Sequence, residues 1–350
     1  MSRNLATLMS QCNSRSELCA ALEPNPRRIH FNSTGTDVTE VLEMILSLSR
    51  NSIEQHQQPI AIIQSNGGTL SFPDVGMSTS AAKKIAVLFS LMRTIQVTVS
   101  TGQIRTIRDV YYTNVELYGD QRKVETGLCS IAKNLHLSSR DSLNILPAQK
   151  GLCYSPFDIV VQTNGQENLI PAKTSSMIPY LAQNSTARIV MRGDANLKLI
   201  VLEKEAVYNK LVGVNTAEDT IFITGKGYPD FLTRLFLNRL QQNICILDWR
   251  IYTDADPHGI DIALKYMQND DHEHYMCQKL VYKGALLTQL LRRKEAQFLQ
   301  MSQRDLSLAI GLTNRLASNS STKLLRVQLQ RQLFFQKKAE MNSLLTSQYL

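Results

Sequence analysis

The sequence of 350 residues predicts an α/β protein, α+β overall, whose two halves follow different patterns. From residue 196 onwards, short apolar segments typical of strands alternate with helical segments, which indicates a mostly parallel sheet with covered faces. Before residue 158, helices with apolar residues at helical spacing dominate. Residues 158–195 are polar, contain Pro171 and Pro179, and are interpreted as an irregular linker between the halves.

Composition narrows the class of protein. The formal net charge of +8 favours a polyanionic partner, either nucleic acid or a membrane surface. The six cysteines include no C-x-x-C pair, which favours reduced thiols inside the cell and argues against a zinc module or a disulfide scaffold. No run approaches the ~18 apolar residues of a membrane span, and the phosphate-loop motif G-x-x-x-x-G-K-[ST] is missing. We therefore expect a soluble intracellular protein without an ATPase motor of its own.

The N-terminal half predicts a helical extension followed by a mixed module. Residues 1–55 form the extension, with amphipathic helices over 1–22 and 37–51. The patterns in residues 56–157 predict strands at 59–63 and 69–72, and helices at 81–99, from Thr106 and at 121–135. A two-stranded ribbon is predicted from Ser139–Ile145 and Lys150–Tyr154, with a turn at Pro147. Helix, turn, helix and a two-stranded ribbon are the pattern of a winged helix, which often lays one helix against DNA.

The C-terminal part, residues 196–350, predicts a sheet that ends in a basic helix. The strand candidates are Leu197–Leu202, Thr220–Thr224, either Ile244–Leu247 or Arg250–Thr253, and Gln278–Tyr282. Residues 322–345 are expected to form one helix whose basic residues are Lys323, Arg326, Arg331, Lys337 and Lys338. We interpret these charges as a solvated helix face rather than as a dedicated DNA contact.

Two aspartates follow an apolar segment in IYTDADPHG, residues Ile251–Gly259. Asp254 and Asp256 are two residues apart at the end of a strand and point to the same side, where open α/β sheets bind ligands. Such hard oxygen ligands suit Mg²⁺. An EF-hand loop is excluded because Lys265 occupies its twelfth position, where a glutamate is needed. A turn with helix-capping aspartates remains open.

A third carboxylate, Glu203, follows the first strand of this sheet in LKLIVLEKE. If that strand lies beside the one that ends in Asp254 and Asp256, the three side chains form an acidic cluster that a cation would neutralise. A helix N-terminus with favourable acidic residues is the alternative. Between these segments, TGKGYPD (Thr224–Asp230) lets the backbone approach a ligand, and Lys226 could meet a phosphate. A tight turn that caps the next helix explains the same residues.

Tyr112 is predicted to be an exposed tyrosine in the segment IRDVYYTNVELY. On a helical wheel it lies beside Arg108, one turn earlier, and away from the apolar side of the helix. That apolar side consists of Ile107, Val110, Tyr111, Leu117 and Tyr118. A nearby guanidinium favours the tyrosinate and can hold a phosphate, so Tyr112 is a candidate nucleophile. A surface tyrosine that packs on an arginine is the alternative.

Five segments, IRDVYYTN, KGLCY, VLEKEAV, ITGKGYPD and YTDADPHG, occur in this order and together resemble the A subunit of topoisomerase VI and its eukaryotic meiotic relative. That relative is the transesterase that starts meiotic recombination by breaking both DNA strands. Segments such as LNILPAQKGLCYSPF and LFFQKKAEMN are most similar to its budding-yeast form. The resemblance covers nearly the whole chain and is weakest over 158–195 and at the extreme N-terminus. It implies a winged-helix domain joined to a Rossmann-like Toprim domain over 196–350.

The resemblance also implies roles for individual residues. The nucleophile is Tyr112, with Arg108 as its associated arginine. The ligands of Mg²⁺, for which Mn²⁺ can substitute, are Glu203, Asp254 and Asp256. The implied DNA contacts are Lys150, Lys226 and Tyr228.

The implied reaction is attack of Tyr112 on a DNA phosphodiester, which leaves a 5′-phosphotyrosine link and a free 3′-OH. The implied partners are double-stranded DNA, a B-type subunit, other meiotic break-forming factors and a second copy of the chain, whose metal Tyr112 meets. The implied location is the nucleus, on meiotic chromosomes, and a membrane is not among the implied partners. Two other classes stay open from the residues alone: a Toprim nuclease or primase-like phosphotransferase, in which Tyr112 is dispensable, and a non-catalytic DNA-binding scaffold.

Overall fold

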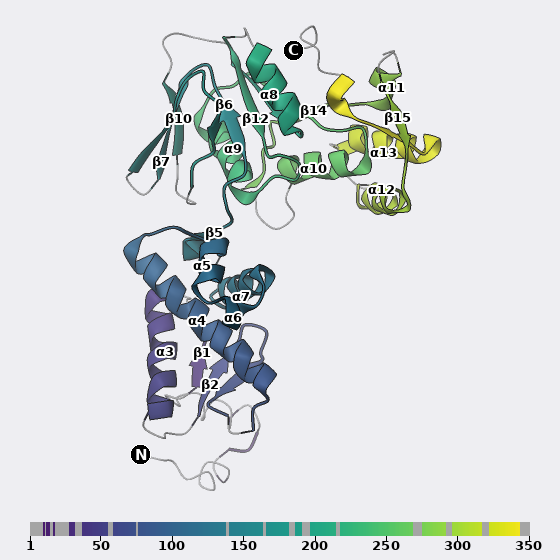
Figure 1. Ribbon diagram of the computed structural model, residues 1–350. Coiled ribbons are helices and arrows are strands. Elements are labelled where there is room, and N and C mark those ends of the chain that lie inside the picture. The colour runs from purple at the N-terminus through teal and green to yellow at the C-terminus, as the bar shows by residue number, and fades with distance from the viewer. Residues whose placement is uncertain are drawn as a thin grey trace. The chain divides into compact units, whose positions relative to one another are not determined.

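The structure is a computed structural model in which the chain divides into two compact units, Met1–Ala148 and Gln149–Leu350 (Figure 1). It describes residues 28–31, 37–54, 59–74, 76–137, 140–163, 166–181, 186–190, 197–214, 218–268, 275–291, 296–316 and 322–343, with positions 10, 12–14 and 17. The amphipathic helix predicted over 1–22 lies almost entirely outside these residues. In the described part of the chain, each helix is too short or too polar to cross a membrane.

The first unit is mainly helical. Its helices are α3 (Val38–Glu54), α4 (Thr79–Thr101), α5 (Ile107–Thr113), α6 (Val115–Tyr118) and α7 (Gln121–Asn134), with the 3₁₀ turn η1 (Arg140–Leu143). A three-stranded sheet is formed by β1 (Arg28–His30), β2 (Ile60–Ile63) and β3 (Thr69–Phe72), and a short parallel pair by β4 (Arg105–Thr106) and β5 (Ile145–Leu146). Apolar residues at helical spacing, including Ile45, Leu91, Ile95 and Leu128, form its core because each helix turns one apolar face inward.

The sequence predicted most of this unit. The helices expected over 37–51, 81–99 and 121–135 are confirmed, as are the strands at 59–63 and 69–72. Gly102 ends α4 in the left-handed conformation at φ 67°, as its position after Ser-Thr suggests. The parallel strand β1 was not predicted, since three residues next to two prolines give little periodic signal.

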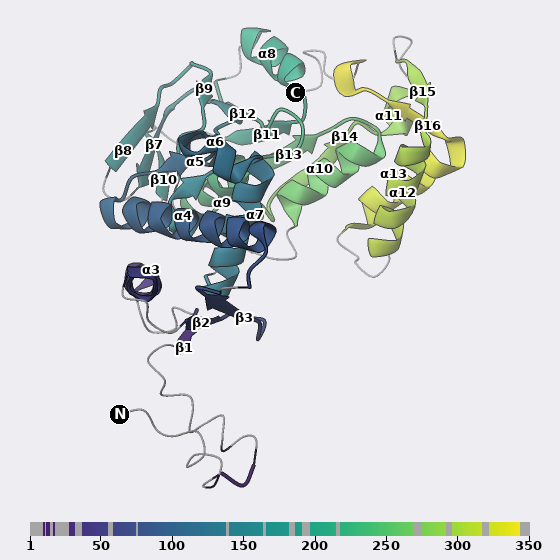
Figure 2. The same cartoon turned by 60° about the horizontal axis from the view of Figure 1, so that its bottom comes forward.

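The second unit is built on a six-stranded sheet. Its strand order is β14 (Val281–Gly284), β13 (Asp248–Tyr252), β11 (Lys198–Leu202), β12 (Thr220–Thr224), β6 (Leu152–Tyr154) and β9 (Ser176–Met177). The first four strands run parallel to one another. Strand β6 is antiparallel to both of its neighbours, β12 and β9. All of β12 is buried, as expected for a central parallel strand. Helix α8 (Glu205–Val214) lies on one side of the sheet, and α9 (Phe231–Asn243) and α10 (Pro257–Met267) lie on the other (Figure 2).

The ribbon predicted at Lys150–Tyr154 does not form a wing in the first unit. Strand β6 pairs with β12 instead, with Tyr154 opposite Phe222 and Leu152 opposite Thr224. The side chains of Cys153 and Tyr154 are buried within the second unit. The residues from Gln149 onwards, including Lys150, therefore belong to that unit.

The irregular linker predicted over 158–195 also differs from the structure. Its described residues contain β7 (Asp158–Thr163), β8 (Gln166–Ile170) and β10 (Thr186–Val190), which form an antiparallel sheet in the order β10-β7-β8. Ile159, Val160 and Val161 are buried in succession, and Gln162 is the exposed residue of this strand. The polar residues between these strands concealed them in the sequence.

The C-terminal region contains α11 (Leu287–Leu290), β15 (Phe298–Gln300), α12 (Gln303–Arg315), α13 (Lys323–Phe335), β16 (Lys337–Ala339) and η4 (Met341–Ser343). The single helix predicted over 322–345 was wrong in its second half. Gln336 adopts φ 50°, which ends α13, and the chain then returns as β16 to pair with β15. Lys338 therefore lies on a strand rather than on a helix.

Candidate functional site

The local sequence of α5 presents Tyr112. Thr106 and Asp109 form a capping box, in which each residue's backbone N–H donates to the other's side chain at 3.0 Å. These hydrogen bonds lower the pKa of Asp109. They start a helix of seven residues, too short to be stable without caps and packing.

Tyr112 and Tyr111 have the different environments that the helical wheel predicts. Tyr111 is half-buried and packs against the core of the first unit, whereas 58% of the Tyr112 surface is exposed. The Arg108 guanidinium donates to the Tyr112 hydroxyl at 3.5 Å, and its central carbon lies 5.6 Å from the ring centroid. The hydroxyl is therefore open to solvent next to a permanent positive charge.

The predicted acidic cluster forms at the ends of two neighbouring strands. Strands β11 and β13 are parallel partners, with Leu202 opposite Tyr252, so Glu203 and Asp254 follow at the same edge. The backbone N–H of Asp254 donates to the Glu203 carboxylate at 2.8 Å. Asp256 caps α10 by accepting from the Gly259 N–H at 2.6 Å, so the helix-capping alternative is also correct for this residue.

The three carboxylates interact electrostatically. Burial, together with the charges of Asp254 and Asp256, raises the pKa of Glu203 to about 7. Burial and the Asp254 charge also raise the pKa of Asp256, although the Gly259 N–H, His258 and Lys338 oppose the shift. The cluster therefore holds more negative charge than its surroundings neutralise, which is the condition that a bound cation relieves.

The donor set fits a hard divalent cation but is not arranged as a finished coordination shell. In the ranges that the structure describes, three His, Cys, Asp or Glu side chains do not yet converge at metal-binding distance. Asp254 is engaged by Lys204 at 3.0 Å and by the backbone N–H of Met341 at 2.8 Å. Carboxylate oxygens are nevertheless the ligands that Mg²⁺ prefers, and burial together with the neighbouring carboxylates raises the pKa values of Glu203 and Asp256.

The TGKGYPD segment forms a tight turn beside Glu203. Lys226 and Gly227 have positive φ values of 54° and 90°, and the Gly227 N–H donates to the Glu203 backbone carbonyl at 2.8 Å. Gly225 has to be a glycine because a Cβ there would lie 2.4 Å from the Tyr266 hydroxyl. Lys226 pairs with Glu205 at 2.9 Å, so its ammonium group reaches the same strand end as the acidic cluster.

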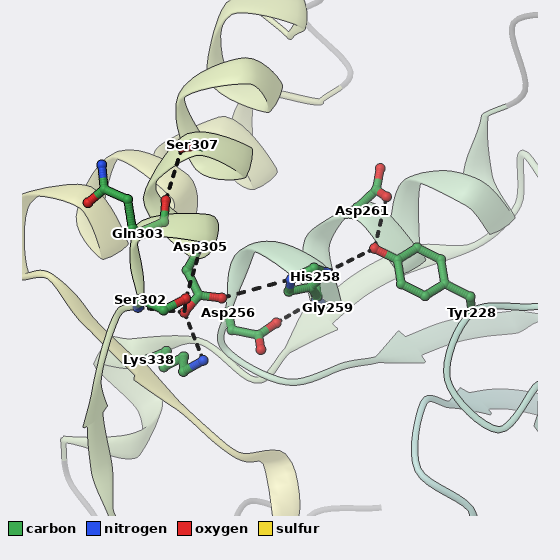
Figure 3. Close-up of polar contacts among 10 residues, drawn as sticks. All are labelled: Tyr228, Asp256, His258, Gly259, Asp261, Ser302, Gln303, Asp305, Ser307 and Lys338. Carbon is green, nitrogen blue, oxygen red and sulfur yellow. Dashed lines mark hydrogen bonds and ion pairs between the residues drawn. The ribbon is translucent and has the colours of Figure 1, made fainter.

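Tyr228 in this turn begins a polar network that continues across α10 (Figure 3). Its hydroxyl lies 3.1 Å from His258 Nδ1 and donates to Asp261 at 3.1 Å. His258 Nε2 in turn lies 3.9 Å from Asp305, which is buried and pairs with Lys338 at 2.8 Å. Burial opposes ionisation of Asp305, but hydrogen bonds from Lys338 and Ser302 lower its pKa to about 2.

Sequence reasoning missed most of this network. His258 stands inside the DPHG segment, and S-Q-R-D at 302–305 matches a capping box, so both signals were readable. Their contact joins residues far apart in the chain, which a single sequence cannot reveal.

The structure places Lys150 beside Tyr228. The Lys150 backbone N–H donates to Asp230 at 3.0 Å, and its ammonium group donates to the Tyr228 carbonyl at 3.0 Å. Lys150, Lys226 and Tyr228 therefore come together in the second unit, next to the acidic cluster, while Tyr112 and Arg108 lie in the first.

The parallel strands that are followed by Glu203 and by the Asp-x-Asp pair lie in a part of the chain that matches Toprim domains. Residues 198–350 match the family of Toprim domains from Spo11 and from the A subunit of topoisomerase 6, and residues 83–145 match the family described as Type IIB DNA topoisomerase.

Relatives of known name agree with these matches. Meiosis-specific protein SPO11 of Saccharomyces cerevisiae is 38% identical over 391 residues, which cover 97% of this chain and 98% of that protein. Meiotic recombination protein rec12 of Schizosaccharomyces pombe is 32% identical and covers 75% of this chain and 73% of its own length. The human Meiotic recombination protein SPO11 is 32% identical over 54% of this chain and 47% of its own length. The chain belongs to the family formed by Spo11 and the A subunit of topoisomerase 6.

Proposed function

We propose that this protein is a DNA-cleaving transesterase that makes meiotic double-strand breaks through a 5′-phosphotyrosine intermediate and so initiates homologous recombination. The observation that carries the proposal is the exposed hydroxyl of Tyr112 with the Arg108 guanidinium at 3.5 Å. A buried tyrosine could not reach a phosphate, and a tyrosine without a cation would attack the negatively charged phosphodiester unaided. The family membership and the acidic cluster support the same reading.

In the proposed reaction, the Tyr112 oxygen forms a bond to phosphorus and the bond from phosphorus to the 3′ oxygen breaks. The tyrosine loses its proton, and the leaving oxygen gains one to become a 3′-OH. Arg108 orients the hydroxyl and stabilises the charge that develops on the phosphoryl oxygens. Glu203, Asp254 and Asp256 would hold Mg²⁺, or Mn²⁺ in its place, and the bound ion supplies further neutralisation at the phosphate.

DNA binding is proposed to depend mainly on phosphate contacts. The helices of the first unit would lie against the DNA, and Lys150, Lys226 and Tyr228 would contact the backbone near the acidic cluster. Tyr228 is 40% exposed, and the chain carries a net charge of +8. Binding should therefore weaken steeply as salt rises, with little dependence on base sequence.

The proposed assembly contains two copies of the chain, other meiotic break-forming factors and a B-like subunit of the topoisomerase VI type, on meiotic chromosomes in the nucleus. Each break needs two tyrosines, one for each strand. In this dimer, Tyr112 of one copy would act with the metal site of the other. The meiotic names of the relatives support this assignment of process and place.

The decisive experiment looks for protein attached to 5′ DNA ends after denaturation, using the assembled complex with DNA and Mg²⁺ or Mn²⁺. The wild type should give an adduct that maps to Tyr112, and Tyr112→Phe should abolish it. Tyr111→Phe is the matched control, because it removes the neighbouring hydroxyl and should leave the adduct detectable. An adduct that persists in Tyr112→Phe would contradict the proposal and favour a different nucleophile.

A further inference from the structure

Lys204 lies between two carboxylates at the edge of the acidic cluster. Its ammonium group is 3.0 Å from Asp254 Oδ2 and 3.1 Å from Glu340 Oε2. Lys204 directly follows Glu203 at the end of β11, and 26% of its side chain is exposed. Glu340 comes from the opposite end of the second unit's sequence, directly after β16, and 55% of its side chain is exposed.

The backbone holds Glu340 in place independently of Lys204. Ala255 and Ala339 exchange two backbone hydrogen bonds, at 2.8 and 3.2 Å. The Met341 N–H donates to Asp254 Oδ1 at 2.8 Å. Residues 339–341 are thereby fixed along the Asp-x-Asp loop, so Glu340 stays within reach of Lys204 whether or not the ion pair to Asp254 exists.

These contacts occupy both oxygens of Asp254. Oδ1 accepts from the Met341 backbone, and Oδ2 faces the Lys204 ammonium group. A divalent cation that binds Asp254 through Oδ2 must take the place of the ammonium group, because two cations cannot share that oxygen without strong repulsion at short range. Glu340 offers the displaced ammonium group a second carboxylate only one side-chain movement away.

We propose that Lys204 is the resident counter-ion of Asp254. When a divalent cation binds, the Lys204 ammonium group leaves Asp254 Oδ2, and Glu340 holds that ammonium group in the loaded site. The inference rests on the proposed function only in assuming that the acidic cluster binds a divalent cation. Lys204 and Glu340 are positioning residues, since they determine whether Asp254 is available.

This exchange predicts opposite effects for the two partners. Lys204→Met removes the competing cation and should raise the affinity for Mn²⁺ by about fivefold. Glu340→Gln leaves Asp254 as the remaining carboxylate partner of Lys204 and should lower that affinity by about threefold. If the ion pairs served only the fold, both variants would weaken binding, because each would loosen the same loop.

The test measures Mn²⁺ binding by electron paramagnetic resonance on the full chain in its assembly, without DNA, so that cleavage is not the readout. Lys210→Met is the matched control, since this exposed lysine on α8 carries the same charge. The Mn²⁺ affinity of this variant should match that of the wild type. In the double variant Lys204→Met/Glu340→Gln, the glutamine should have no further effect, whereas simple loss of negative charge would still lower affinity. Thermal melting of each variant reports folding, and Lys204→Arg, which keeps the pair, should not gain affinity.

Each result is decisive. Opposite shifts that vanish in the double variant support the exchange, as does Mn²⁺ binding that appears only in Lys204→Met. A loss of Mn²⁺ affinity in both Lys204→Met and Glu340→Gln would overturn the exchange. Unchanged affinity in both variants, with a loss in Asp256→Asn, would also overturn the exchange but would still support the metal site. Absence of Mn²⁺ binding in the wild type and in Lys204→Met would overturn both the exchange and the proposed metal site.

Discussion

Tyr112 and Asp254 are held in opposite ways. Tyr112 stands on a seven-residue helix, is 58% exposed, and has one long hydrogen bond of 3.5 Å from Arg108. Asp254 is 9% exposed, forms an ion pair with Lys204 and accepts a hydrogen bond from the backbone N–H of Met341. The difference suits the roles proposed for them: a nucleophile for another molecule has to be accessible, whereas side chains that hold a cation need a rigid support.

This contrast separates what a substitution does in each region. If Tyr112 is the proposed nucleophile, changes there should remove chemistry with little effect on folding, because the side chain has few packed neighbours to lose. Around Asp254 the proposed metal ligands also support the fold: Asp256 caps α10, and Asp254 joins Glu203 to the C-terminal segment, so changes there can affect folding as well as chemistry. The predictions below test that separation, starting with the largest effect.

Asp256→Asn should separate the two roles of this residue most strongly. Asparagine keeps a side-chain oxygen that can accept from the Gly259 N–H, but it loses the charge proposed to hold the metal. Adduct formation should fall at least about 100-fold, while the unfolding free energy changes by less than about 1 kcal/mol. Adduct yield and thermal melting measure the two effects.

Asp248→Asn is the control for this prediction, because it removes a charge from the opposite end of β13 and should leave the adduct intact. A strong loss of stability in Asp256→Asn would show that the charge, rather than the cap, supports the loop.

Gly259→Ala should show how tightly the Asp-x-Asp loop is packed. A Cβ at this position would lie 2.3 Å from the Asp254 carbonyl oxygen, so the backbone of the loop has to move. We expect a loss of about 2 kcal/mol in unfolding free energy, measured by denaturant titration. Gly311→Ala on α12 is the control, because a Cβ there meets no atom within 4 Å. It should raise stability by about 0.5–1 kcal/mol through helix propensity, and equal effects at both glycines would contradict the packing argument.

The same contrast explains which parts of the site the sequence could predict. The exposure of Tyr112 follows from helical periodicity within the seven residues of α5, although the predicted helix breaks at Asn114 before α6. The alignment of Glu203 with Asp254 follows from two neighbouring parallel strands. Both depend on short, regular patterns. In the fold, the same kind of pattern predicted α3, α4, α7 and the central strands β11 and β12.

Contacts between distant segments could not be predicted in this way. Glu340 reaches Lys204 because Gln336 turns the chain into β16, yet residues 322–345 carry a continuous helical pattern in the sequence. Likewise, the sequence around Cys153 and Tyr154 fits a strand of a wing and a strand of another sheet equally well. Only tertiary packing decides between the two. Register and pairing partners are properties of the whole fold.

The raised pKa of Glu203 predicts an unusual pH dependence without divalent ions. The folded protein keeps the Glu203 proton up to about pH 7, whereas the unfolded chain loses it near the ordinary value of 4.5. The folded state therefore binds more protons over this range, and the unfolding free energy should fall as pH rises, by about 3 kcal/mol. Glu203→Gln should flatten this slope in chemical denaturation with a chelator present, and added Mg²⁺ should restore stability at pH 7. A wild-type slope equal to that of Glu203→Gln would contradict the shift.

Thr106→Ala should have the smallest effect and tests the support of the nucleophile. Alanine keeps the chain but removes the oxygen that caps α5, at an expected cost of about 1 kcal/mol in unfolding free energy. Because α5 spans only seven residues, its last turn should fray and Tyr112 should spend less time in register with Arg108. Adduct yield should then fall by about two- to fivefold. Thr106→Ser, which keeps the oxygen, should restore both stability and yield. If yield stays at the wild-type level while stability falls, then the exposed tyrosine acts without an ordered helix, and Arg108 does not need to be held one turn before it.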